Sequence, residues 1–402
     1  MKAIVFREIG NIRLEDIPEP KIEQPTDAIV RLTSSAICGT DLHMVRGTMP
    51  GMVPGTVLGH EGVGIVEEIG RNVRNLSKGD RVIIPSTIAC GTCAYCRAGY
   101  YSQCDTANPN GPRAGTAFFG GPKATGPFHG LQAEYARIPF ANIGPVKIPE
   151  ELNDDAAILL SDIFPTGWFG AEMAEIKPGD VVLVYGCGPV GLFSILSAHL
   201  MDAGRVLAVD RLPSRLERAR ALGAETINFD EEDPVQIVME LTAGIGADRV
   251  IDAVGVDAEP PSKGPAADSI RKRRQEFQQQ LKTAAPGARS EGEHWVAGQA
   301  PSLALDWALQ SVAKAGTLSV VGVYPETAHF FPWGEAMNRN LTINAGNCPH
   351  RRYLPHLIEL VTSGTVDPRV VLSQKVSFGS ALEAYEKFDH REEGWIKVEL
   401  KL

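Results

Sequence analysis

The stretch VVLVYGCGPVGLFSILSAHLM, residues 181–201, decides the fold of this 402-residue chain. An apolar run is followed by the turn Gly186-Cys-Gly188-Pro-Val-Gly191 and then by a second, helix-prone apolar run. The stretch carries no Asp, Glu, Lys or Arg and is long enough to cross a bilayer, but glycine and proline interrupt its middle. We therefore interpret it as a buried strand, a tight turn and a buried helix.

Further apolar strands alternate with helical stretches from about residue 164 to residue 325. They are RVLAVD at 205–210, RVIDAVG at 249–255 and TLSVVGVY at 317–324. Near-continuous apolar strands separated by helices are typical of a parallel sheet with helices on both faces. The pattern predicts a doubly wound α/β domain over residues 164–346.

The first 150 residues and the end of the chain have a different pattern. Short β-prone runs at 28–37, 62–70 and 80–86 are separated by turns rich in Gly, Pro and Asn, as in an irregular barrel-like domain. The final strand WIKVELKL is assigned to this domain together with the helical segment before it. We place this domain at residues 1–163 and 347–402.

Composition and charge exclude several classes of protein. Lys and Arg number 39 against 49 Asp and Glu, a net charge of −10, whereas a nucleic-acid binder normally shows a basic excess. The hydrophobic fraction of 44% is ample for buried cores. Charge appears too early for a secretory signal, so we expect a cytoplasmic protein without nucleic-acid or membrane partners.

Four of the seven cysteines, Cys90, Cys93, Cys96 and Cys104, form the pattern C-x2-C-x2-C-x7-C. Clustered cysteines in a reducing compartment indicate a metal site rather than disulfides. Four thiolates suit tetrahedral Zn²⁺ and leave no position for a substrate, so this zinc is predicted to be structural. An iron–sulfur cluster is the competing interpretation.

The glycine turn is a dinucleotide fingerprint because it follows a strand and opens a helix. Gly186 permits the turn, Gly188 lets a pyrophosphate approach the backbone, and Gly191 allows close packing of helix and strand. Asp210 ends the next strand, where a carboxylate would bind the adenosine ribose and repel a 2′-phosphate. This favours NAD over NADP, although Arg211 would favour NADP if the acid were absent.

An unusually long connection, residues 256–316, separates two of the predicted strands. Its basic run Arg271–Arg274 is balanced nearby, because residues 257–300 hold seven Lys and Arg against six Asp and Glu. We expect a solvated insertion with a central helix. Since it begins at the strand edge where ligands bind, it is predicted to cover part of the cofactor; a subunit contact and a plain solvent loop are the alternatives.

Upstream of the cysteine cluster, the chain carries Cys38-Gly-Thr-Asp-Leu-His43 and Gly59-His-Glu-Gly62. With the four-cysteine lobe and the glycine turn, these motifs resemble the zinc-dependent medium-chain alcohol dehydrogenase family over nearly the whole chain. The resemblance implies an α/β protein with a β-rich GroES-like catalytic domain and a doubly wound Rossmann domain that binds NAD. It also implies a second zinc, so we expect two Zn²⁺ per chain.

By this resemblance, Cys38 and His60 are ligands of a catalytic zinc. The third family ligand is usually a cysteine just before the cofactor domain, but this chain has Asp162 in that place. An aspartate oxygen is a legitimate zinc ligand and keeps a fourth position open. The aspartate and the insertion resemble the formaldehyde-dehydrogenase-like branch. Glu61 is a candidate for transient ligation or for tuning the field at zinc, and Asp41 for fixing the tautomer of His60.

Residues near Cys38 also resemble the proton-transfer groups of the family. Thr40 matches the hydroxyl that accepts the substrate proton. His43 matches the relay that passes it to solvent through the cofactor ribose, with a surface histidine as the alternative. Lys397 lies where relatives place a basic residue on the pyrophosphate. The predicted cofactor contacts are Gly186, Gly188, Pro189, Val190, Gly191, Asp210, Arg211, Arg215, Val254, Val323 and Lys397.

These residues predict an enzyme that transfers a hydride between NAD and a small primary alcohol or aldehyde of the formaldehyde kind. A polyol or amino-alcohol dehydrogenase and an aldehyde dismutase are alternatives on the same machinery. A zinc protein without turnover is disfavoured because Cys38, Thr40, His43 and His60 are all present, and a DNA-binding zinc module is disfavoured by the acidic context. We also expect a homo-oligomer, either a dimer or a tetramer.

Overall fold

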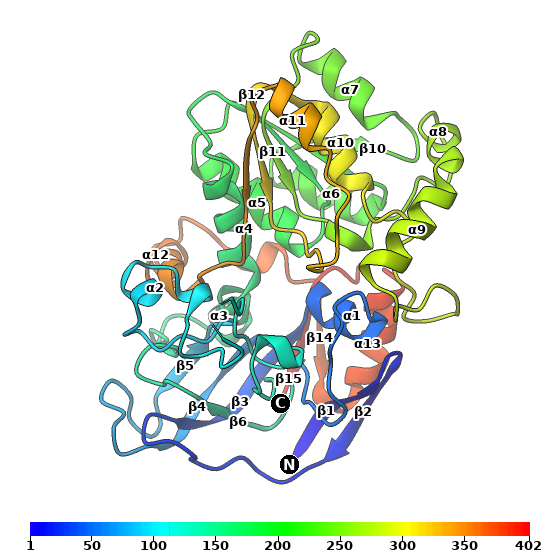
Figure 1. Cartoon of the computed structure of the whole chain (residues 1–402). Coiled ribbons are helices and arrows are strands. Elements are labelled where there is room, and N and C mark those ends of the chain that lie inside the picture. The colour runs from blue at the N-terminus through cyan, green and yellow to red at the C-terminus, as the bar shows by residue number, and fades with distance from the viewer. Residues whose placement is uncertain (112) are drawn as a thin grey trace. The chain divides into compact units, whose positions relative to one another are not determined.

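The computed structural model describes residues 1–111 and 113–402. It divides into two units, Met1–Pro165 with Asn347–Leu402, and Thr166–Gly346 (Figure 1). The first of these boundaries lies two residues beyond the one expected from the sequence, and the second coincides with it. Within the described residues, no helix is long and apolar enough to cross a membrane.

The second unit is built on a parallel sheet with the strand order β10-β9-β8-β11-β12-β13. This is the doubly wound order of dinucleotide-binding domains, and helices lie on both faces of the sheet (Figure 1). The strands are β8 (Val181–Tyr185), β9 (Arg205–Asp210), β10 (Glu225–Asn228), β11 (Ala247–Asp252), β12 (Val312–Val320) and β13 (Thr342–Ala345). The helices are α5 (Pro189–Leu200), α6 (Pro213–Ala221), α7 (Pro234–Leu241), α8 (Ala267–Lys272), α9 (Arg274–Ala284), α10 (Leu303–Ser311) and α11 (Trp333–Asn338).

Two strands of this sheet, β10 and β13, were not among those expected from the sequence. Their sequences, ETIN and TINA, are short and polar, and both strands lie at the edges of the sheet. An edge strand buries few side chains, so it lacks the continuous apolar run that identifies a central strand. The four central strands carry that run and were predicted.

The connection between β11 and β12 is shorter and better packed than the sequence suggested. α10 packs on the sheet and β12 begins at Val312, so residues 303–316 belong to the domain core and the insertion is confined to about 256–302. Within it, Ile270 of α8 and Phe277 of α9 are buried in the same core cluster as the strands. The insertion, expected to be solvated with one central helix, thus contains two helices that pack on the core through a few residues and expose most of the others. Its role as a cover for the cofactor stays a prediction.

The basic run Arg271–Arg274, at the junction of α8 and α9, makes structural contacts. The guanidinium of Arg273 donates to Asp306 of α10 at 2.7 Å and to Glu276 at 2.7 Å. It also lies over the ring of Phe277, 4.6 Å from its centroid. These contacts tie the junction of α8 and α9 to the helix that covers the sheet.

The first unit is a β-rich domain with a few helices. A small sheet pairs β1 (Lys2–Glu8) with β2 (Asn11–Asp16), and the larger sheet has the order β14-β15-β3-β4-β5-β7, with β6 also on β3. These strands are β3 (Ala28–Ile37), β4 (Gly62–Ile69), β5 (Arg81–Ile84), β6 (Tyr135–Ile138), β7 (Val146–Lys147), β14 (Gln374–Ser377) and β15 (Val398–Lys401). The helices are α1 (Gly39–Arg46), α2 (Ala94–Arg97), α3 (Asp154–Ser161), α12 (His350–Thr362) and α13 (Ala381–Asp389), and α4 (Ile163–Met173) crosses the boundary between the units.

The C-terminal strand belongs to this first unit, as the sequence predicted. β15 pairs antiparallel with β3, with Val398 opposite Ile37 and Leu400 opposite Ser35. The last residues of the chain therefore lie beside the end of β3, one residue before Cys38. This pairing brings Lys397 into the neighbourhood of the predicted zinc ligands.

The buried position of α9 predicts a stability effect. Phe277→Ala should lower the free energy of unfolding by about 3–5 kcal/mol, because it leaves a cavity under the helix. Gln278→Ala, at the neighbouring exposed position, is the control and should change it by less than about 0.5 kcal/mol. Urea unfolding followed by circular dichroism measures both. Equal, small effects would mean that α9 is not part of the core.

Candidate active site

Four cysteines converge in the loop that follows β5. The sulfur atoms of Cys90, Cys93, Cys96 and Cys104 all lie within 4.8 Å of one another. The Sγ atoms of Cys93 and Cys104 are 3.9 Å apart, close to the ~3.8 Å that a tetrahedron of zinc–sulfur bonds requires. Backbone N–H groups point at the sulfurs: Cys90 and Ala107 donate to Cys104 Sγ, Thr92 and Cys93 to Cys90 Sγ, and Cys96 to Cys93 Sγ.

The ionisation of these thiols fits a bound cation. Burial opposes ionisation of Cys90, but hydrogen bonds from Thr106 and Thr92 outweigh it and bring its pKa to about 6. Burial raises the pKa of Cys96 and of Cys104. Four thiolates can share one loop only with a positive ion between them, and Zn²⁺ supplies that charge.

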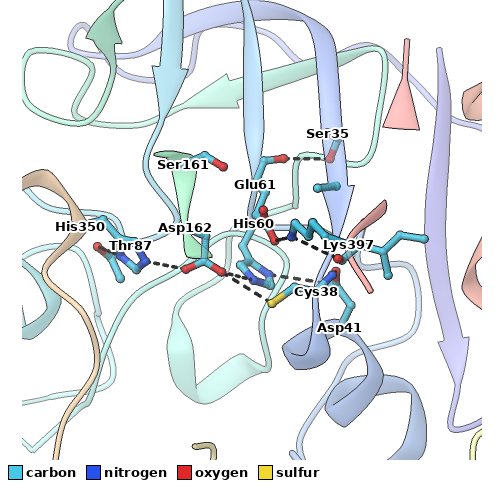
Figure 2. A network of polar contacts seen from close by, with 12 residues as sticks. Ser35, Cys38, Asp41, His60, Glu61, Thr87, Ser161, Asp162, His350 and Lys397 are labelled. Carbon is cyan, nitrogen blue, oxygen red and sulfur yellow. Dashed lines mark hydrogen bonds and ion pairs between the residues drawn. The ribbon is translucent and has the colours of Figure 1, made fainter. Parts of the chain in front are cut away.

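A second group of ligand atoms comes together in the same unit. Cys38, His60, Glu61 and Asp162 each place one such atom within 4.8 Å of the others, and all four residues are buried. Oδ2 of Asp162 lies 3.3 Å from Nε2 of His60 and 3.6 Å from Sγ of Cys38 (Figure 2). The three ligands predicted for the catalytic zinc therefore converge on one point.

The ligand residues lie at junctions between consecutive helices and strands. Cys38 lies between β3 and α1, with an extended backbone at the N-cap of the helix. His60 and Glu61 immediately precede β4, and Asp162 interrupts the path from α3 to α4 with φ −147° and ψ −66°. Residues at such junctions project from the ends of elements, so several ends can meet at one site.

The site carries a strongly negative field. Burial acts to lower the pKa of His60, but Asp41 and Cys38 outweigh it and hold the pKa well above its usual value. Burial acts to raise the pKa of Asp162, but hydrogen bonds from His350 and His60 outweigh it and hold the pKa well below its usual value. Buried acids and a thiol that surround a histidine in this way match the sulfur, nitrogen and oxygen donor set that zinc prefers.

A buried carboxylate with hydrogen-bond partners of its own lies behind His60. Oδ1 of Asp41 lies 3.4 Å from Nδ1 of His60, a close contact without a hydrogen bond, so its role in fixing the tautomer stays a prediction. Oδ2 of Asp41 accepts the N–H of Cys38 at 3.0 Å and the side-chain amide of Gln132 at 3.2 Å. Gln132 in turn accepts the hydroxyl of Tyr385 at 2.7 Å. Nε2 of His60 is thereby left facing the other ligands.

Lys397 does not fit the pyrophosphate contact expected from the sequence. Its side chain is 0% exposed, and its ammonium donates to the carboxylate of Glu61 and to the carbonyl of Ile37 at 3.2 Å. A buried ammonium with these partners has no surface to offer a phosphate. It neutralises Glu61 instead. Burial raises the pKa of Glu61 to about 7, and Lys397 acts in the opposite direction.

Thr40 and His43 lie on α1, close in sequence to Cys38. Thr40 is partly exposed in the first turn, whereas His43 is buried, with Nδ1 2.8 Å from Oγ1 of Thr48. The alternative of a surface histidine is therefore excluded. The proton-relay roles of these two residues remain predictions.

The glycine turn in the second unit fits a dinucleotide phosphate. Gly186 has φ +89°, and a Cβ at Gly191 would lie 1.7 Å from the carbonyl oxygen of Gly186, so both positions require glycine. Gly188 caps α5, and a Cβ there would meet nothing nearer than the guanidinium of Arg215 at 3.8 Å. The backbone at Gly188 is thus open to a ligand, beside Pro189 and Val190 at the helix N-terminus.

The remaining predicted cofactor residues in this unit lie at the same edge of the sheet. Val254 and Val323 follow the carboxyl ends of β11 and β12, and the segments are tied by the N–H of Val256, which donates to Val323 at 2.9 Å. Asp210 ends β9 and accepts the N–H of Cys187 in the glycine turn at 2.8 Å. It also accepts the N–H of Arg211 at 2.7 Å, and Arg215 Nη1 lies 3.8 Å away.

The sequence alone did not single out His350, Thr87, Gln132 or Tyr385. His350 and Asp162 are 188 residues apart, and no local spacing links a histidine after Cys-Pro with a distant aspartate. One signal was available in the sequence. Several acidic residues were predicted near His60, and buried carboxylates need hydrogen-bond donors that the local motifs did not contain. That signal indicates a need for partners without saying where they are.

Comparisons with known proteins identify the family. Residues 24–150 match the alcohol dehydrogenase GroES-like domain, and residues 189–260 match the zinc-binding dehydrogenase domain. An uncharacterised zinc-type alcohol dehydrogenase-like protein, AdhB of Bacillus subtilis (strain 168), is 42% identical over 405 residues and the match covers 100% of both chains. The chain belongs to the zinc-dependent medium-chain alcohol dehydrogenase family.

Two further relatives of this alcohol dehydrogenase bear on its fold and chemistry. The structure of alcohol dehydrogenase TADH from Thermus sp. ATN1 has a TM-score of 0.80 and 34% identity, covering 100% of this chain and 99% of that one. A glutathione-independent formaldehyde dehydrogenase of Pseudomonas aeruginosa (strain LESB58) is 38% identical over 273 residues, 64% of this chain and 66% of that one. The GroES-like and Rossmann architecture predicted from the sequence is confirmed.

The two ligand groups predict a metal content. Protein purified without chelator should contain close to two zinc ions per chain, one for each group. Cys104→Ser should retain about one and should melt at a lower temperature, because metal at a closed site contributes folding free energy. Cys348→Ser, a buried cysteine outside both groups, is the control and should retain both ions. Elemental analysis decides, and a reproducible value of one in the wild type contradicts the two-site interpretation.

Proposed function

We propose that this alcohol dehydrogenase oxidises small primary alcohols, or reduces the corresponding aldehydes, with NAD and a zinc held by Cys38, His60 and Asp162. The observation that carries the proposal is the convergence of these three ligand atoms of different type. Such a set leaves a fourth position open, whereas the four-cysteine loop is closed. When bound, the zinc would act as a Lewis acid on the substrate oxygen.

The chain's own residues supply proton handling. The partly exposed hydroxyl of Thr40, two residues beyond Cys38 in the first turn of α1, accepts the proton of a substrate alcohol. His43, one turn along the same helix, takes the proton onward, and Thr48 holds its ring through Nδ1. Histidine is the side chain that most often transfers protons in enzymes, which suits a relay. When bound at the glycine turn of the second unit, NAD would supply the nicotinamide that accepts the hydride.

Asp210 supports NAD rather than NADP as the partner. Its carboxylate lies at the carboxyl end of β9, beside the glycine turn, where it would accept hydrogen bonds from the adenosine ribose of NAD. A 2′-phosphate would meet this negative charge, and Arg211 is placed next to the acid rather than in place of it. The reduced thiols of the zinc sites favour a cytoplasmic location. A dimer or tetramer remains a prediction.

The proposal extends to substrate choice, with formaldehyde and similar small aldehydes as the preferred substrates. It is supported by Asp162 as the third ligand and by the similarity to the Pseudomonas formaldehyde dehydrogenase. A panel of methanol, ethanol, formaldehyde, a polyol and an amino alcohol separates the possibilities by NADH absorbance. Alcohol and acid produced together from aldehyde without net NADH would indicate a dismutase instead.

The ligand role of Asp162 is tested with the same assay. Asp162→Asn should lower kcat/KM for the best alcohol by more than about 100-fold, because a neutral amide is a poor zinc ligand. The variant should keep its fold by circular dichroism and lose close to one zinc per chain. Full activity in this variant would place the third ligand elsewhere, with Glu61 as the first candidate.

Cofactor choice is tested at Asp210. Asp210→Asn combined with Leu212→Arg should shift the kcat/KM ratio toward NADP by roughly tenfold or more, since it removes the repelling charge and adds a donor worth about 1.5–3 kcal/mol. Asparagine keeps an oxygen for the N–H groups of Arg211 and Leu212, but its NH2 group replaces the oxygen that accepts the N–H of Cys187. Leu212→Arg alone is the control and should change little. An unchanged kcat/KM ratio in the double variant would show that Asp210 does not determine the choice between NAD and NADP.

A further inference from the structure

The two carboxylate oxygens of Asp162 have different partners. Oδ2 faces Cys38 and His60, while Oδ1 lies 2.5 Å from Nε2 of His350. Figure 2 shows His350 on the opposite side of the carboxylate from His60 and Cys38. An ionised carboxylate only accepts hydrogen bonds, so the Nε2–H of His350 is the donor. Oδ1 is thereby committed to a protein partner outside the ligand group.

His350 is itself held in a fixed orientation. It is the first residue of α12 and is 3% exposed, and its Nδ1 lies 3.2 Å from Oγ1 of Thr87, which is 5% exposed. Each ring nitrogen therefore has a partner on a separate segment of the first unit. The buried chain Thr87–His350–Asp162 joins the residues after β5, the start of α12 and the junction of α3 with α4.

This orientation matters because a carboxylate can bind a metal through one oxygen or through both. With both oxygens bound, the fourth position of a zinc held by Cys38 and His60 would be filled. With one oxygen bound, that position stays open for the oxygen of a substrate. The terminal torsion of an aspartate is broad, so the side chain does not select between these arrangements on its own.

We propose that His350 is a positioning residue that holds Asp162 in its one-oxygen arrangement and so keeps the fourth zinc position open. The proposal rests on the proposed function, because it takes Asp162 as a ligand. His350 touches neither the substrate nor the ligand atom Oδ2. Its removal should therefore alter the metal site first and the reaction rate as a consequence.

The experiment compares His350→Leu with His350→Gln in the full-length zinc enzyme and in its Co²⁺-substituted form. Leucine removes the donor, whereas the glutamine amide can place an N–H near the position of Nε2. We expect His350→Leu to weaken zinc at the catalytic site by about 10–100-fold in chelator competition. Its cobalt spectrum should differ from that of the wild type, because the second oxygen of Asp162 then takes the fourth position in place of an exchangeable ligand. His350→Gln should restore both properties to within a few-fold of the wild type.

Controls separate this proposal from the proposed function and from misfolding. The four-cysteine zinc is an internal control that should remain bound in every variant. His129 is exposed and accepts the N–H of Val57, and the His129→Leu variant should match the wild type. Asp162→Asn tests the ligand role itself. If it loses the catalytic zinc while His350→Leu does not, only the positioning role is overturned; if it retains that zinc, the ligand assignment fails.

A second variant covers the case in which His350→Leu does not fold. Thr87→Val removes the group that holds Nδ1 and keeps a similar volume, so it should weaken catalytic zinc by a smaller factor than His350→Leu. Unchanged zinc affinity and cobalt spectrum in a folded His350→Leu overturn the proposal. So do wild-type values in Thr87→Val when His350→Leu is unfolded.

Discussion

The carboxylate of Asp162 is buried, and the arrangement of the first unit depends on how the charge of this carboxylate is compensated. An ionised acid with 7% exposure is unfavourable unless hydrogen bonds and opposite charges surround it. His60 reaches it from the start of β4, and His350 reaches it from the start of α12, which packs against α3. These segments must be assembled before the charge is stable, so folding of the unit and formation of the ligand set are coupled.

A second buried charge pair extends this coupling to the end of the chain. Lys397 and Glu61 are 336 residues apart, and both side chains are 0% exposed. Their contact exists because β15 pairs with β3, which places the C-terminal strand beside the segment that precedes Cys38. Removing one member would leave the other buried and uncompensated, an effect that is strongly destabilising. The C-terminal residues are therefore part of the metal site's surroundings.

How much the sequence could predict depends on how local each feature is. The central strands of the parallel sheet carry continuous apolar runs, and the glycine turn carries its own backbone requirement at Gly186, so both were predictable. The edge strands β10 and β13 bury too little to leave such a pattern. The insertion was expected to be solvated with one central helix, whereas the structure has two helices, α8 and α9. Their surfaces are polar, and the few apolar residues that pack them, such as Ile270 and Phe277, are widely spaced.

The two metal groups differ in the same respect. All four cysteines lie within residues 90–104, and backbone N–H groups of this short loop and of Ala107 are aimed at their sulfur atoms. Cys38, His60 and Asp162 span more than a hundred residues and come from three junctions between elements. A closed thiolate site is complete when its ligands are present. An open site also needs rigid surroundings, because nothing at its fourth position prevents the ligands from rearranging, and a carboxylate has a second oxygen with which to do so. The contacts of Asp41 with His60 and of His350 with Asp162 provide that rigidity, and motifs that list only the ligands do not contain it.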